Sequence, residues 1–138
     1  MKKNKKKCII DKYTQPIYNP HNIYVCKNYT KKDLDKLFEF SDKSSIYLED
    51  DPNIASVCYG VIDKKDNIQC IVILLNVDYG KEYKSINTIS HEAFHVAYRI
   101  LDYCGVELTN SSNECYAYLA GWAAECIHKT AIKWMKQK

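Results

Sequence analysis

Two histidines and a glutamate in the segment TISHEAFHVAYRI (residues 88–100) have the types and spacing of a metal site: His91, Glu92 and His95. Residues four apart on a helix lie side by side, so both imidazoles can bind one zinc ion at Zn–N distances of about 2.0–2.1 Å. Glu92 lies about 100° further around such a helix, beside the ion. There it can take a proton from a metal-activated water, because zinc lowers the pKa of that water toward about 7.

A solvated helix face that carries two histidines gives the same five-residue pattern, so a third ligand is needed to distinguish the two readings. Asp102 follows on the histidine face but lies about 10 Å further along the same helix. Glu107 directly follows the predicted helix end. Glu114 falls in the first turn of the next helix, where an antiparallel return would bring its carboxylate toward the ion. We therefore expect Glu114 to be the third ligand.

The pattern His91-Glu92-x-x-His95, eighteen residues and then Glu114 resembles the HExxH-x18-E arrangement of gluzincin metallopeptidases. The segment NECYA (residues 113–117) is similar to the NExFA signature around the third ligand in zinc aminopeptidases of that clan. Residues 87–126 are also similar to short HExxH proteins of tailed bacteriophages. This resemblance implies a small zincin-like domain, Zn²⁺ bound by both histidines and Glu114, and Glu92 as general base and then general acid in hydrolysis of a protein or peptide substrate.

Further expectations come from what the family does and from where this chain departs from it. No GAMEN-like motif is present, so aminopeptidase specificity is not implied, and Tyr118 stands where thermolysin-like enzymes keep an aspartate. In zincins the substrate lies along an edge strand, for which residues 68–77 are the candidate. Asp102 can orient a ligand histidine. Tyr98 or Tyr118 can donate a hydrogen bond to the developing oxyanion.

A second reading is a small zinc-binding structural or interaction protein, such as a phage accessory factor, without peptidase activity. Structural zinc sites are usually closed by four protein ligands, whereas catalytic sites leave one position for water. A fourth ligand from a cysteine or from His128 would favour this second reading.

Length and charge narrow the class of protein. A chain of 138 residues fits one domain, expected over residues 13–138, after a basic flexible tail over residues 1–12. The net charge of +3 includes a single arginine, Arg99, which disfavours nucleic acid binding. We find no signal peptide, and the longest apolar run, residues 71–75, is far below the ~20 residues that cross a bilayer. The sequence therefore predicts a cytoplasmic protein (in the host cytoplasm if phage-encoded) that does not bind membranes; it indicates no oligomeric state.

The seven cysteines are expected to be reduced thiols in a chain without an export signal. Periodicity predicts strands around residues 24–26, 57–62 and 68–77, the last two forming a hairpin. It predicts helices over residues 31–40, 87–103 and 112–135, with a capping box at Thr30 and Asp33 and a stop at Gly105. Gly121 is expected to let the last two helices approach closely. Together these elements predict an α+β domain with an antiparallel or mixed sheet, an active-site helix and a C-terminal helix.

Overall fold

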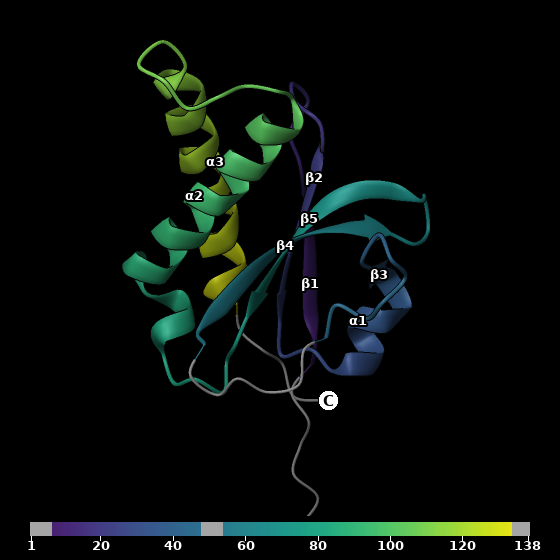
Figure 1. The fold of residues 1–138 in the computed structure, drawn as a ribbon. Helices are drawn as coiled ribbons and strands as arrows, with labels where there is room; N and C mark the ends of the chain where they lie inside the picture. The colour runs from purple at the N-terminus through teal and green to yellow at the C-terminus, as the bar shows by residue number, and fades with distance from the viewer. Residues whose placement is uncertain (1–6, 48–53, 134–138) are drawn as a thin grey trace, which may run out of the picture.

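A five-stranded sheet forms the centre of the protein, as seen in a computed structural model that describes residues 7–47 and 54–133 (Figure 1). The α+β prediction is confirmed, and the sheet is mixed. The β2–β5 pair is parallel, and the pairs β1–β2, β5–β4 and β4–β3 are antiparallel. In spatial order the strands are β1 (Ile9–Thr14), β2 (Asn22–Lys27), β5 (Ile68–Leu75), β4 (Ser56–Asp63) and β3 (Phe38–Glu39).

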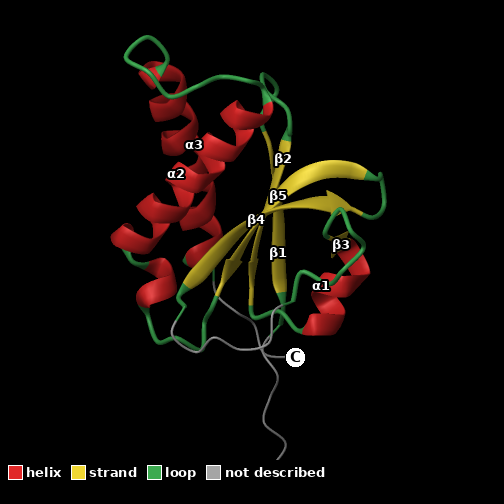
Figure 2. Cartoon of the chain, in the orientation of Figure 1, coloured by secondary structure: helices red, strands yellow, loops and turns green. Residues whose placement is uncertain are grey.

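Helices cover both faces of the sheet (Figure 2). The two long helices α2 (Ile86–Tyr103) and α3 (Asn113–Ala131) pack together on one face, and α1 (Lys31–Leu37) lies on the other. A short 3-10 turn, η1 (Glu82–Lys84), precedes α2. Because both faces are covered, β5 is buried from Cys70 to Leu75. This explains why its sequence is an almost unbroken apolar run rather than an alternating one.

The helix that carries the histidines has clear start and stop signals. Ser85 caps α2, its hydroxyl accepting a hydrogen bond from the Thr88 backbone N–H at 3.1 Å. Gly105 ends the helix with φ +75°, a left-handed conformation that glycine adopts without steric cost. Both the predicted helix and its predicted stop are confirmed, which fixes where His91 and His95 lie on the helix surface.

Two predicted boundaries differ in the structure. The capping box of Thr30 and Asp33 is present, but α1 ends at Leu37 because Phe38 and Glu39 turn into β3 and pair with β4. Helix α3 ends at Ala131, short of the predicted residue 135, and residues 134–138 lie outside the described part.

The predicted basic tail is partly wrong, because residues 9–12 belong to β1 and pair with β2. β1 is also joined to α3 by polar contacts. The Thr130 hydroxyl donates to Asp11 at 2.7 Å and lies 2.7 Å from the Tyr13 hydroxyl, and Lys133 forms an ion pair with Asp11 at 2.8 Å. The folded domain therefore begins before residue 13. Residues 1–6 of the predicted tail lie outside the described part.

Lys27, the last residue of β2, is buried with only 1% of its surface exposed. Its ammonium group donates to the carbonyls of Ala131, the last residue of α3, at 2.9 Å and of Lys133, two residues further, at 2.5 Å. Carbonyls at a helix end lack intrahelical partners, so this lysine supplies donors that the helix cannot. Burial, together with the charge of Lys84, lowers the pKa of Lys27 below its usual 10.5.

The prediction that Gly121 lets α2 and α3 approach closely is wrong. Gly121 is exposed, and a Cβ added there would meet nothing within 4 Å. A glycine inside a helix costs about 0.5–1 kcal/mol relative to alanine. We therefore expect Gly121→Ala to raise the free energy of unfolding by about that amount, measured by urea denaturation. Gly105→Ala is the matched control and should lower it, because φ is positive there. A Gly121→Ala protein that is less stable than the wild type would contradict the open space around this position.

The seven cysteines all lie within the described residues and form no disulfide bond with one another there. In the described ranges, the helices lack the combination of length and apolar character that a membrane span requires.

Candidate functional site

The two histidines lie together on the solvent-exposed face of α2. Their Nε2 atoms are 3.1 Å apart, and their ring centroids are 4.7 Å apart in an edge-to-face arrangement. Two Zn–N bonds of about 2.0–2.1 Å at a tetrahedral angle would hold the nitrogens about 3.4 Å apart. The pair is therefore already close to the separation that one shared cation requires.

Glu92 points inward, toward the start of β4, and is only 4% exposed. Its Oε1 accepts a hydrogen bond from the Ser56 hydroxyl at 2.8 Å and lies 4.0 Å from His91 Nε2. Its Oε2 is buried and has no hydrogen-bond partner among the described residues. A buried carboxylate oxygen without a donor is costly, and such atoms are rare in native proteins. Glu92 is therefore held at one oxygen and left free at the other, beside the histidines.

The predicted third ligand is not brought into the same cluster. Within residues 7–47 and 54–133, no group of three His, Cys, Asp or Glu side chains is arranged to hold a metal ion. Glu114 lies exposed in the first turn of α3. Tyr116, two residues further, packs against Tyr98, with ring centroids 6.4 Å apart, so this part of α3 contacts α2 beyond His95 toward its C-terminal end. Glu114 as a ligand remains a prediction.

The three supporting residues expected from the sequence make no contact with the histidines in the described part of the chain. Asp102 makes no hydrogen bond to either imidazole in the described part of the chain and lines a pocket further along α2. Tyr98 is 46% exposed and stacks on Phe94 with centroids 6.3 Å apart. Tyr118 is 63% exposed on α3. Their predicted roles stay predictions.

Cys58 lies on the side of β4 that faces α2 and α3. Burial raises the pKa of the Cys58 thiol to about 12; the Arg99 guanidinium opposes this rise and the Glu92 carboxylate adds to it. A thiol held protonated is a poor metal ligand. His128, the other candidate for a fourth ligand, is exposed near the C-terminal end of α3. Neither residue closes a four-ligand structural site in the described ranges.

The edge strand beside the histidines is β4, not residues 68–77. The strand in that range, β5, lies between β2 and β4, so the predicted substrate strand is wrong. β3 pairs only with Ile62 and Asp63 of β4, which leaves residues 56–61 as a free edge within the described part. The direction of the backbone groups along this edge follows from one hydrogen bond: the Ala55 carbonyl, next to Ser56, accepts from the Asn76 N–H at 2.9 Å. In an antiparallel pair of strands, every second residue hydrogen-bonds to the partner strand and the residues between them point the other way. Counting from Ala55, the N–H and C=O groups of Ser56, Cys58 and Gly60 therefore point away from β5.

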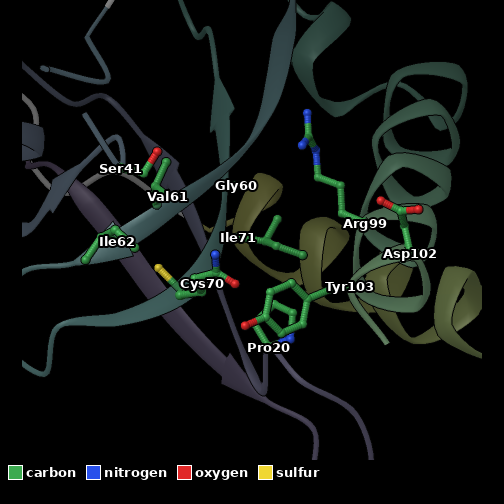
Figure 3. Close-up of a pocket in the computed structure, with 11 residues that line it drawn as sticks. Pro20, Ser41, Gly60, Val61, Ile62, Cys70, Ile71, Arg99, Asp102 and Tyr103 are labelled. Carbon is green, nitrogen blue, oxygen red and sulfur yellow. The ribbon is translucent and has the colours of Figure 1, made fainter. Parts of the chain in front are cut away.

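Arg99 contacts this edge from α2. One guanidinium nitrogen, Nη2, donates to the Cys58 carbonyl at 3.3 Å, and a Cβ added at Gly60 would lie 3.7 Å from Nη1. A pocket of about 220 Å³ lies at the Gly60 end of this edge, with Arg99 and Asp102 on its α2 side and Gly60 on its β4 side (Figure 3).

Three residues of this region, Ser56, Gly60 and Arg99, have no role among those predicted from the sequence. For Arg99 the signal was present, because it follows His95 by four residues and so continues the His91–His95 row along one helix face. For Ser56 and Gly60 no local signal exists, since their roles depend on how β4 packs against α2.

Comparison of the chain with protein-family models, with curated proteins and with solved structures finds no match.

Proposed function

We propose that this protein is a zinc-dependent metallopeptidase that hydrolyses peptide bonds of a protein or peptide substrate. The observation that supports this most is the environment of Glu92: a buried carboxylate, anchored at Oε1 by Ser56 and unpartnered at Oε2, beside two imidazoles whose Nε2 atoms are 3.1 Å apart. An unpaired buried oxygen lowers stability, so a role in chemistry is the physical reason to keep it.

His91 and His95 fit a divalent cation through their Nε2 atoms, and Glu114 is the predicted third ligand. When bound, zinc would supply Lewis acidity and lower the pKa of a water molecule toward about 7. Glu92 takes a proton from the attacking water, and the Ser56 hydrogen bond to Oε1 holds the carboxylate in place. As the oxygen of that water bonds to the carbonyl carbon and the C–N bond breaks, Glu92 passes the proton to the leaving nitrogen.

The free edge of β4 is the proposed binding place for the substrate backbone. An extended peptide can add as a further strand, hydrogen-bonding to the outward-facing groups of Ser56 and Gly60 and to the Cys58 N–H, while the Cys58 carbonyl accepts from Arg99. Such a strand would pass beside Glu92, because Ser56 contacts Glu92 at the start of the same edge. Recognition through backbone groups favours an unfolded or extended protein segment as substrate.

The test combines metal analysis of the purified protein with cleavage of unfolded casein. The proposal predicts one zinc per chain and cleavage that stops on chelation and returns with zinc. His95→Ala should remove both the zinc and the activity. Zinc bound at one equivalent without cleavage of casein or other unfolded proteins would instead support the structural or interaction protein.

Glu114→Ala tests the third ligand separately. Loss of a ligand should weaken zinc binding by more than the about 10- to 100-fold typical of residues that only support ligands. Glu125→Ala is the matched control, because Glu125 is an exposed glutamate of the same helix, paired with Lys129 at 3.3 Å. Equal zinc affinity in both variants would show that Glu114 is not a ligand.

A further inference from the structure

We propose that the pocket at the far end of the β4 edge is a specificity site, in which Arg99 binds a carboxylate of the peptide substrate. This inference rests on the proposed function, since it concerns a substrate that lies along β4. The carboxylate can belong to an acidic side chain or to the C-terminus of the peptide.

The pocket continues the groove that starts at Glu92. Along β4, Ser56 contacts Glu92 and Gly60 lines the pocket, and four residues of strand span about 13 Å. Along α2, Arg99 lies one turn beyond His95. A peptide paired with the edge therefore passes the histidines first and reaches the pocket about four residues further.

Arg99 has free donors where the peptide would pass. A guanidinium carries five N–H donors in a planar fork, and the described hydrogen bonds of Arg99 all go to Cys58, to its carbonyl at 3.3 Å and to its side chain. In the described part of the chain no carboxylate lies within 4.0 Å of this guanidinium. An unpaired arginine fork is suited to bind a carboxylate through two parallel hydrogen bonds. Its bond to the strand edge also fixes its position before the substrate arrives.

The size and walls of the pocket suit one side chain. A volume of about 220 Å³ is below the range of sites for whole small molecules, while a cavity of about 150 Å³ already accommodates a benzene ring. Ile71 and Pro20 supply apolar wall, which suits the methylene stem of a glutamate, and Gly60 leaves space because it has no side chain.

Asp102 also lines the pocket and has the opposite charge. It forms no ion pair with Arg99 at 4.0 Å or less in the described residues, and Figure 3 shows its carboxylate on the helix, away from β4. It would repel a bound carboxylate or attract a cationic side chain. Neutralising Asp102 should strengthen binding of a carboxylate but weaken binding of a cationic side chain, so a variant at this residue distinguishes the two kinds of ligand most clearly. We assign the site to a carboxylate because Arg99, not Asp102, contacts the strand along which the peptide lies.

The experiment uses fluorescein-labelled decapeptides of one neutral sequence with an amidated C-terminus, in which a single position carries Glu, Gln or Lys. The position is moved along the peptide, and a fourth series has Gln with a free C-terminal carboxylate. For the wild-type zinc protein, kcat/KM should favour Glu over Gln by about 10- to 100-fold, most strongly when Glu lies about four residues from the cleaved bond. A preference in the free-carboxylate series instead would identify the peptide end as the carboxylate source.

Three variants test the residues. Arg99→Gln should reduce the Glu-to-Gln ratio to about one, and Arg99→Lys should restore part of it, because lysine keeps the charge but lacks the fork. Asp102→Asn should increase the ratio. Lys36→Gln, an exposed residue of α1, is the control for the loss of one positive charge and should leave the ratio unchanged.

Two results would overturn the inference while leaving the peptidase intact: equal cleavage of the Glu, Gln and free-carboxylate peptides, or a preference for Lys that Asp102→Asn removes. If no peptide is cleaved, the proposed function fails, and fluorescence anisotropy then measures peptide binding alone. Tighter binding of the Glu peptides that Arg99→Gln abolishes would still support the carboxylate site. Binding without this preference would reject it.

Discussion

Glu92→Gln is expected to lower the rate of peptide hydrolysis by about 10²- to 10⁴-fold, the contribution typical of a general acid–base group. Glutamine keeps the size of the side chain and an oxygen that can accept the Ser56 hydrogen bond, but it cannot take a proton from water at pH 7. Zinc content should be unchanged, because Glu92 lies beside the two imidazoles and is not a predicted ligand. The measurements are kcat/KM on a cleaved peptide and zinc per chain.

The same variant should not lose stability. The wild-type side chain buries a carboxylate oxygen without a partner, which costs free energy, so removing the charge should leave the free energy of unfolding at or above the wild-type value. Glu125→Gln on the surface of α3 serves as the control and should change neither activity nor stability. A Glu92→Gln protein that is inactive and markedly less stable would point to a structural role for Glu92, and one that stays active would refute its proposed proton transfer.

Lys27→Ala is expected to lower the free energy of unfolding by about 2–4 kcal/mol, because it removes a buried side chain and the donors to two carbonyls at the C-terminal end of α3. Lys27→Met keeps most of the volume and should cost about 1–3 kcal/mol. Lys129→Met removes an exposed ion pair and should cost less than about 1 kcal/mol. Chemical denaturation measures all three. If Lys27→Met were as stable as the wild type, the hydrogen bonds to the helix end would contribute nothing net.

The lysine also predicts a dependence on pH. Because burial first, and then Lys84, lower its pKa in the folded protein, the unfolded chain binds more protons at Lys27 between that pKa and 10.5. Stability then rises with pH over this window. The difference in unfolding free energy between the wild type and Lys27→Met should therefore grow as the pH approaches 10.5. A difference that shrinks over the same range would contradict the buried position of the ammonium group.

Local patterns were enough to predict the helices and the hairpin. The apolar period of α2, the serine before it and Gly105 after it are all signals within one segment, and so are the alternating runs of β4 and the turn before β5. The prediction that residues 68–77 form the edge strand for the substrate was wrong, and the composition of β5 already shows why. An unbroken apolar strand is typical of the inside of a sheet with both faces covered, not of an exposed edge. The parallel pairing of β2 with β5 joins distant segments and has no local signal.

The site was predictable to the extent that it lies on one helix. Helix geometry alone places His91 beside His95 and places Glu92 about 100° around the helix, beside them, as the structure has them. Whether Glu114 reaches the histidines depends on the nine residues between α2 and α3 and on how the two helices slide against each other, which spacing does not determine. The contact of Ser56 with Glu92 depends on the packing of α2 against β4 in the same way.

The polar contacts between β1 and α3 determine where the N-terminus of an expressed protein can be placed. The lysine-rich start of the sequence invites a truncation at residue 13, which would delete four of the six residues of β1 and remove Asp11, the partner of both Thr130 and Lys133. Such a shortened protein would expose the unpaired backbone groups of β2, which can pair with a second chain and cause aggregation. An N-terminal affinity tag should be placed so that all of β1 is kept, and any shortened protein that begins at residue 13 should be tested for precipitation before a lack of activity is interpreted.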